Sequence, residues 1–243
     1  MRPLRWPLKR ILKMMLSTRH IAIILAITCL VGGLAIIRPV VAQTAPSVII
    51  TWQAQNYFPA DFPGKARITP SSQVTAAIDM VQGVKLINLS SAQVSWFVND
   101  ALVQSGLGLT NITFTASPDA NNLVSIRVQI QTGGGTYQNS ISIQAVAPFS
   151  VIDHPSVTPN VSAGSSVTLT AWPYFFNVGS LSDLKFTWQV NGGTYTSNGN
   201  QLTLQIGTPQ SVLQQTLPVT LTTQNTQNPL EFSRNISVLN IAQ

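Results

Sequence analysis

The chain has 243 residues, a formal net charge of +6 and a sequence pI near 9.9. Residues 1–42 contain seven Lys or Arg and no acidic residue, whereas residues 43–243 contain six Lys or Arg and seven Asp or Glu. Binding to a nucleic-acid backbone needs a cluster of basic side chains on a folded surface. Because the larger part of the chain is close to neutral, we expect no nucleic-acid partner.

The N-terminal part predicts a membrane segment. Residues 1–20 are basic, and residues 21–37 follow as an apolar run without a charge. As a helix this run would be about 25 Å long, slightly less than the ~30 Å hydrocarbon core of a bilayer, and the residues up to 42 lengthen it. The basic residues before the run predict residues 1–20 in the cytoplasm and residues 43–243 outside it.

Two interpretations of residues 21–42 stay open. A retained anchor would tether the chain to the membrane through residues 21–41. A signal peptide would be cleaved after Ala42 and the protein would be secreted, because Val40 and Ala42 are small residues at the positions that a signal peptidase reads. The apolar run is longer than the usual ~7–15 residues of a signal peptide, so we favour the anchor.

Beyond residue 46 the sequence predicts an all-β fold. Short alternating stretches are separated by turn residues at a spacing typical of β-sandwiches. In one of them Val124, Ile126, Val128 and Ile130 alternate with other residues before a Gly-rich turn. Residues 43–243 contain no Cys, so this part depends on its hydrophobic core without help from a disulfide.

Several stretches of the first half recur in the second half in the same order. The matched pairs are 73–80 with 166–173, 94–100 with 186–192, 109–116 with 200–207, and 139–143 with 234–238. A repeat of this length predicts one self-sufficient sandwich that has been duplicated. We therefore expect two tandem Ig-like β-sandwich domains, at 47–147 and 148–243.

The clearest repeat is a Trp-x-Val-Asn stretch, which reads SWFVNDALVQSG from Ser95 and TWQVNGGTYTSNG from Thr187. Alternation places the Trp and the Val on one face of a strand, which predicts four structural core residues: Trp96, Val98, Trp188 and Val190. The Asn-Asp and Asn-Gly pairs that follow predict tight hairpin turns, because these residues accept a positive φ.

A Trp-bearing strand followed by Asn-Asp or Asn-Gly, in tandem copies behind a membrane segment, resembles the Ig-like and PKD-like modules of prokaryotic cell-surface proteins. The resemblance covers nearly all of residues 47–243, and it implies a β-sandwich fold and a place outside the membrane. Neither WFVNDA nor WQVNGG matches the WDFGDG-like turn of a PKD module, and the paired cysteines of antibody-type domains are absent. The resemblance therefore carries no functional residues to this chain.

No catalytic motif stands out in the sequence. Residues 43–243 contain a single His, His154, and their acidic residues are scattered singly. A zinc site needs several nitrogen or sulfur ligands, and a nucleophilic Ser needs a strained turn of the GxSxG type. We expect no enzyme activity, no cofactor and no metal. A hydrolase with an unrecognised site is a lower alternative, and a calcium ion near Asp153 stays open.

Two aromatic stretches form the predicted binding surface. Trp52 to Ile68 follows the first predicted strand, and the second half shows no counterpart of it. In Ala171 to Phe176, alternation points two aromatic side chains outward. The candidate residues are Trp52, Tyr57, Phe58, Phe62, Trp172 and Tyr174. The alternatives are that the first stretch covers the open end of its own sandwich, and that the second is interrupted by a bulge at Pro173 or packs against the first domain.

These features predict a non-enzymatic surface protein, membrane-tethered or exported, that acts as a binding or structural module of the cell envelope. We favour contact with an envelope protein, because uncharged sheets with exposed edges can dock other β-modules. The alternative is a glycan-binding, adhesin-like module, since outward aromatic rings can stack on sugars.

Overall fold

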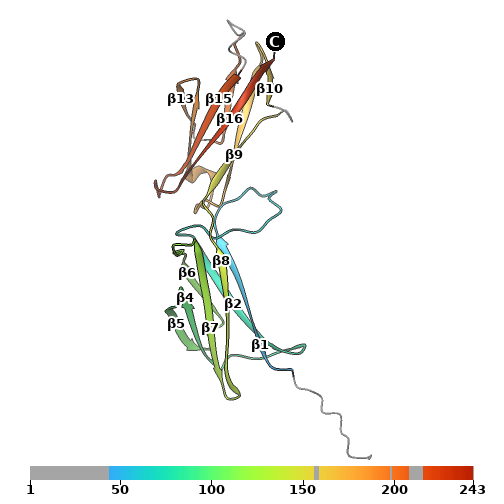
Figure 1. Ribbon diagram of the computed structural model, residues 1–243, viewed down its shortest axis with the longest axis vertical. Helices are drawn as coiled ribbons and strands as arrows, with labels where there is room; N and C mark the ends of the chain where they lie inside the picture. Colours follow the sequence, from blue (N-terminus) through green and yellow to red (C-terminus); the bar gives the residue numbers. More distant parts are fainter. Residues whose placement is uncertain (1–43, 156–158, 198, 208–215, 243) are drawn as a thin grey trace, which may run out of the picture. The chain divides into compact units, whose positions relative to one another are not determined.

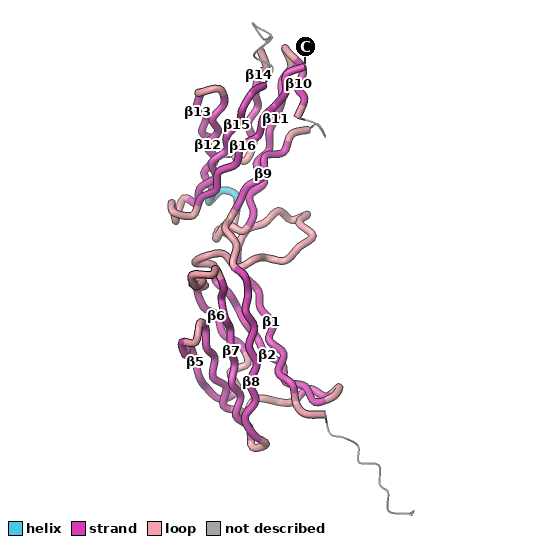
Figure 2. Tube along the Cα trace, viewed as in Figure 1, coloured by secondary structure: helices cyan, strands magenta, loops and turns pink. Residues whose placement is uncertain are grey.

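The computed structural model describes residues 44–155, 159–197, 199–207 and 216–242. Its regular elements in these ranges are β-strands and one 3-10 turn, Leu181–Asp183 (Figure 2). The basic segment 1–20 and the expected membrane segment 21–42 lie outside the described residues. Within the described ranges, no helix is long and apolar enough to cross a bilayer.

The first sandwich has two antiparallel sheets (Figure 1). In one sheet β2 pairs with β1 along one edge and with β3 and β6 along the other, and the second sheet has the order β5-β4-β7-β8. The strands are β1 (Ser47–Gln55), β2 (Gln73–Gln82), β3 (Lys85–Leu86), β4 (Gln93–Val98), β5 (Ala101–Leu107), β6 (Asn111–Thr115), β7 (Leu123–Thr132) and β8 (Gly135–Gln144).

The second sandwich repeats this strand order and adds β10. Its sheets have the orders β14-β11-β9 and β10-β16-β15-β12-β13, and β10 pairs with β16 in parallel. The strands are β9 (Phe149–Asp153), β10 (Asn160–Ser162), β11 (Ser166–Tyr174), β12 (Leu184–Val190), β13 (Gly193–Ser197), β14 (Gln201–Gln205), β15 (Thr216–Asn225) and β16 (Phe232–Ala242). The expected all-β tandem of Ig-like sandwiches is confirmed.

Alternation of apolar residues explains the two cores. On β7, Val124, Ile126, Val128 and Ile130 are fully buried, and the residues between them are only partly covered. One buried cluster extends from Val48 to Ala145 and a second from Ile152 to Leu239. The domain limits 47–147 and 148–243 remain our proposal for where each sandwich begins and ends.

The repeated Trp lies at the centre of each core. Trp96 and Trp188 are both fully buried. The Trp96 indole N–H donates to the Leu109 carbonyl at 2.9 Å, whereas Trp188 Nε1 has no acceptor in the described part of the chain. Of the two valines, Val190 is buried, whereas Val98, the last residue of β4, is only half-buried.

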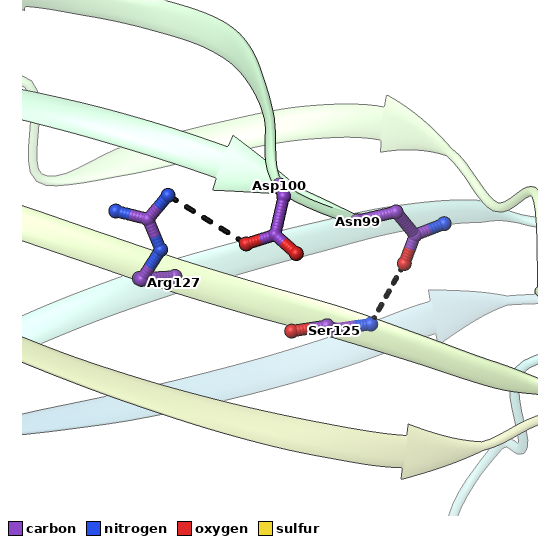
Figure 3. Close-up of polar contacts among 4 residues, drawn as sticks. All are labelled: Asn99, Asp100, Ser125 and Arg127. Atoms are coloured by element: carbon purple, nitrogen blue, oxygen red, sulfur yellow. Dashed lines mark hydrogen bonds and ion pairs between the residues drawn. The ribbon is translucent and has the colours of Figure 1, made fainter.

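Both Trp-bearing strands end in a two-residue hairpin turn. Asn99 and Asp100 have φ of 48° and 63°, and Asn191 and Gly192 have φ of 45° and 83°. The predicted turns are therefore confirmed. Figure 3 shows how the first turn is fixed: Asn99 Oδ1 accepts the Ser125 amide at 2.9 Å, and Asp100 Oδ1 lies 3.7 Å from an Arg127 guanidinium nitrogen.

An Asn side chain links the two sheets of each sandwich at the same place. Asn139 Nδ2 donates to the Val48 carbonyl at 2.6 Å, and Asn235 Nδ2 donates to the Ser150 carbonyl at 2.7 Å. Asn139 therefore corresponds to Asn235. The sequence overlay had matched Asn139 with Arg234, and it was wrong by one residue, a shift that exchanges the two faces of a strand.

The turn before β2 also recurs before β11. The Ser71 amide donates to the Ala116 carbonyl, and the Gly164 amide donates to the Ile206 carbonyl, each at 2.9 Å. Ser71 has φ of 68° and Gly164 has φ of 75°. Only the second copy has the residue that adopts this conformation without strain.

Replacing Ser71 with Gly should raise the free energy of unfolding of the first sandwich by about 0.5–1 kcal/mol. The left-handed conformation costs a residue with a side chain ~1–2 kcal/mol, and the greater freedom of Gly in the unfolded chain offsets part of the gain. Urea denaturation monitored by Trp fluorescence measures this difference. Ser91, whose φ is not positive, is the control, and Ser91→Gly should destabilise. Equal effects of the two substitutions would contradict the argument.

Trp96→Phe should destabilise its sandwich by about 1 kcal/mol more than Trp188→Phe destabilises the other. Both changes remove similar apolar area, but only Trp96→Phe breaks a partly buried hydrogen bond, while Trp188→Phe removes a polar group that has no partner among the described residues. The same denaturation experiment, resolved for each sandwich, tests the difference. A larger cost at Trp188 would refute it.

Candidate functional site

The loop between β1 and β2 contains an insertion relative to the second copy. In the first copy Ile68 lies 20 positions after Val48, but in the second Val161 lies only 11 positions after Ser150. Ile68 and Val161 correspond, because both are buried beside the end of the last strand of their sandwich. The expectation that the second half has no counterpart of this loop was therefore only partly correct. The end of the loop corresponds to β10, and only its apolar part is absent from the second copy.

The inserted residues contact the second sandwich. The Tyr57 amide donates to the Phe176 carbonyl at 2.7 Å, and the Phe175 amide donates to the Tyr57 carbonyl at 2.6 Å, which forms an antiparallel bridge. Farther along the loop, Thr69 Oγ1 donates to Asn177 Oδ1 at 3.0 Å. Asn177 Nδ2 in turn donates to the Pro70 carbonyl at 2.9 Å. We call these contacts, together with the aromatic cluster described next, the clasp.

Aromatic side chains from both predicted stretches meet in this cluster. The Phe62 ring lies edge-on to Tyr174 and Phe175, with centroids 5.5 and 5.6 Å away. Tyr174 also stacks on Phe149 at 4.9 Å with an interplanar angle of 13°. Phe175 is buried although its φ is 63°, a conformation that costs a bulky residue free energy. The packing of the cluster offsets this strain.

A buried carboxylate supports the clasp from within the second sandwich. Glu231 is only 7% exposed, and its two oxygens accept the Asn177 amide at 2.7 Å and Asn225 Nδ2 at 2.6 Å. These bonds position Asn177 toward the first sandwich. Sequence reasoning missed both Asn177 and Glu231. Glu231 is the only glutamate in the chain, a signal that could have drawn attention to it, whereas nothing in the sequence marks Asn177.

The other candidate residues lie apart from this cluster or at its border. Trp52 lies on β1 rather than in a loop, and Trp52 and Phe58 both pack against the first core. Trp172 lies on β11 opposite Val151, and its indole N–H is 3.4 Å from Asp153 Oδ2. The structure thus places Tyr57, Phe62 and Tyr174 in the clasp and leaves the two tryptophans outside it.

The chemistry of this region is that of packing and hydrogen bonding, with Glu231 as a carboxylate acceptor. Among the residues that the structure describes, no group of three or more His, Cys, Asp or Glu side chains is arranged to hold a metal ion. His154 is half-buried after β9, and its Nδ1 has no partner in the same described ranges. The contacts join polypeptide segments to one another, and the charged side chains of the same loop, such as Asp61 and Lys65, are exposed.

No protein-family model matches the chain, and no curated protein matches it. Among solved structures, it is similar to the fibronectin(III)-like modules of CbhA from Clostridium thermocellum, with 13% identity, 79% of this chain and 93% of that chain covered, and a TM-score of 0.28. It is also similar to the three N-terminal domains of the highly immunogenic outer capsid protein of bacteriophage RB49, with 12% identity, 81% of this chain and 70% of that chain covered, and a TM-score of 0.31. A third similar structure is the central fibronectin-III array of RIM-binding protein, with 14% identity, 79% of this chain and 69% of that chain covered, and a TM-score of 0.28.

The class of the protein follows from its own strand order. The first sandwich packs a four-stranded sheet against another four-stranded sheet, and the second packs a three-stranded sheet against a five-stranded one, with one buried Trp in each. The chain is a tandem of Ig-like β-sandwiches. Such sandwiches host many unrelated functions, so the function depends on the side chains that the surface presents and not on the fold.

Asn177→Ala should weaken the clasp and leave both cores intact. The change removes two hydrogen bonds to the first sandwich, each worth ~0.5–1.5 kcal/mol. Hydrogen exchange at the Tyr57 and Phe175 amides should therefore become roughly 5- to 150-fold faster, if these amides exchange through local opening. Asn111→Ala, at an exposed position of β6, is the control and should leave both amides unchanged. Unchanged exchange in Asn177→Ala would show that Asn177 does not hold the contact.

The clasp should weaken at high pH. Burial, with a smaller contribution from Asp61, raises the pKa of Tyr57 above its ordinary value of 10.0. As the pH rises above 10, the unfolded chain loses the phenol proton before the folded chain does, so the stability present below pH 10 is lost. The free energy of unfolding of the native chain should fall more steeply in this range than that of Tyr57→Phe. Parallel curves from pH 9 upward would contradict the assignment.

Proposed function

We propose that the chain is a non-enzymatic binding or structural module of the cell envelope, tethered to the membrane or exported, that works by contact with another protein. The clasp supports a structural role, because it ties one sandwich to the next through backbone bonds and ring contacts. Its aromatic side chains are engaged within the chain, so the partner has to bind elsewhere.

The observation that carries the proposal is the exposed edge strand β5. Among the strands that the structure describes it pairs only with β4, six of its seven residues are exposed, and none of them is charged. Leu102 and Leu107 are 59% and 71% exposed. Natural edge strands are usually protected by charges, Pro or bulges, and here only a bulge opposite Trp96 and Phe97 interrupts the pairing. An uncharged edge with apolar side chains suits a partner that adds a strand or packs an apolar surface there.

Affinity capture tests the proposal. The full-length tagged chain, in mild detergent, is incubated with solubilised envelope from the source cells, and the retained proteins and glycans are identified. A set of specific envelope proteins should be retained by the native chain. Leu107→Lys should lose that set, because it places a charge on the edge without disturbing the core.

Val84→Lys is the matched control, since Val84 is fully exposed in the turn after β2. It should retain the same proteins as the native chain. Equal retention by all three chains would remove β5 as the contact, and retention of no protein by any of them would overturn the proposal in favour of a spacer.

Glycan binding is the second candidate and rests on Trp172. Its half-buried ring lies on the outer face of a sheet next to the Asp153 carboxylate, a pairing that suits a sugar ring and its hydroxyl groups. Tyr174 is less suitable, because Phe149 and Phe62 pack against it. Retention of glycan alone in the capture experiment, lost in Trp172→Ala, would favour this function over protein contact.

A further inference from the structure

The insertion that forms the clasp also creates a cleft in the first sandwich. The cleft has a volume of about 570 Å³ and lies between β1 and the loop that follows it. Its lining residues are Ile50, Thr51, Trp52, Gln53, Phe58, Lys65 and Ala66. Clefts of a few hundred Å³ with an apolar lining are typical of ligand sites. Trp52 and Phe58, two residues of the predicted binding surface, thus line the same cleft.

The backbone of β1 is open on the side of this cleft. The Val48 carbonyl accepts from Asn139 on β8, so it points away from β2. Successive residues of a strand face opposite edges, so Ile50 and Trp52 point the same way as Val48. The pairing of β1 with β2 supports this orientation. Ile78, which lies opposite Ile50, donates its amide to the Thr110 carbonyl and not to β1. In the described part of the chain, no backbone bond satisfies Ile50 or Trp52 along this edge.

The charge at the cleft is positive. Lys65 is the only charged residue in the lining, it is exposed, and it forms no ion pair within the described residues. A free strand edge recognises an extended backbone, an apolar recess selects a side chain, and a lone ammonium group selects a carboxylate. A segment with these three features would satisfy every group that the cleft leaves open.

We propose that the cleft binds an extended peptide segment of a partner protein. The segment adds as a strand to the free edge of β1, inserts one large apolar side chain between Trp52 and Phe58, and pairs a carboxylate with Lys65. This inference rests on the proposed function as a protein-binding module, and it names a second contact surface, distinct from β5, and the chemistry of its partner.

Selection from a displayed library of random nine-residue peptides tests the proposal, with the full-length chain in detergent as the target. The native chain should enrich peptides that contain a large apolar residue and an Asp or Glu, without Pro between them. Lys65→Glu should enrich basic residues in place of the acidic ones and bind the first set at least tenfold more weakly. Lys85→Glu, an exposed Lys on β3, is the matched control and should select the same peptides as the native chain.

Hydrogen exchange distinguishes strand addition from other modes of binding. A selected synthetic peptide should slow exchange at the Ile50 and Trp52 amides and leave the Ala101–Leu107 amides unchanged. Absence of enrichment, the same peptides selected by Lys65→Glu and the native chain, or binding without protection of β1 would each overturn the proposal. Loss of envelope-protein capture with intact peptide selection would instead count against the β5 contact alone.

Discussion

Burial of apolar side chains around one Trp is the constraint on which each sandwich depends. Residues 43–243 contain no Cys, so no covalent link between the sheets assists folding. Trp96 and Trp188 fill the space that the two sheets enclose, and an Asn side chain at the end of the same cross-strand row joins the sheets at their edge. With the interior fixed in this way, loops and edge strands are free to differ between the copies, and these differences carry the functional features.

The main difference between the copies is the insertion after β1. Its residues form the backbone bridge to Phe175 and Phe176, fill the aromatic cluster through Phe62, and build one wall of the cleft beside Trp52. One local change therefore produces both the connection between the sandwiches and a candidate binding site. Elsewhere the two copies are similar in detail, because the Ser71 and Gly164 amides make equivalent hydrogen bonds in equivalent turns.

The elements predicted from the sequence are those with a periodic or local signal. Alternation revealed β7, and the Asn-Asp and Asn-Gly pairs revealed the hairpins, because both depend on neighbours along the chain. The clasp was accessible only in part, since Tyr57 and Tyr174 stood out as aromatic but nothing in the sequence showed that their segments meet. Asn177 acts through single hydrogen bonds between distant segments, and such bonds leave no pattern. The shift of one residue at Asn139 arose because β16 has Ile236 and Val238 on its exposed face, so that its alternation matches NSISI only in the wrong register.

The clasp also has a consequence for the order in which the chain becomes structured. The first core contains no buried residue beyond Ala145, so it can form before the second sandwich has been synthesised. Tyr57 and Phe62, in contrast, find their partners on residues that follow β11, more than a hundred positions later. Until those residues have been synthesised, the aromatic side chains of the inserted loop lack these partners. Because the two segments belong to one chain, each then meets the other at a high effective concentration. The clasp therefore cannot close until the chain has been made past β11, by which point all residues of the first core are already present.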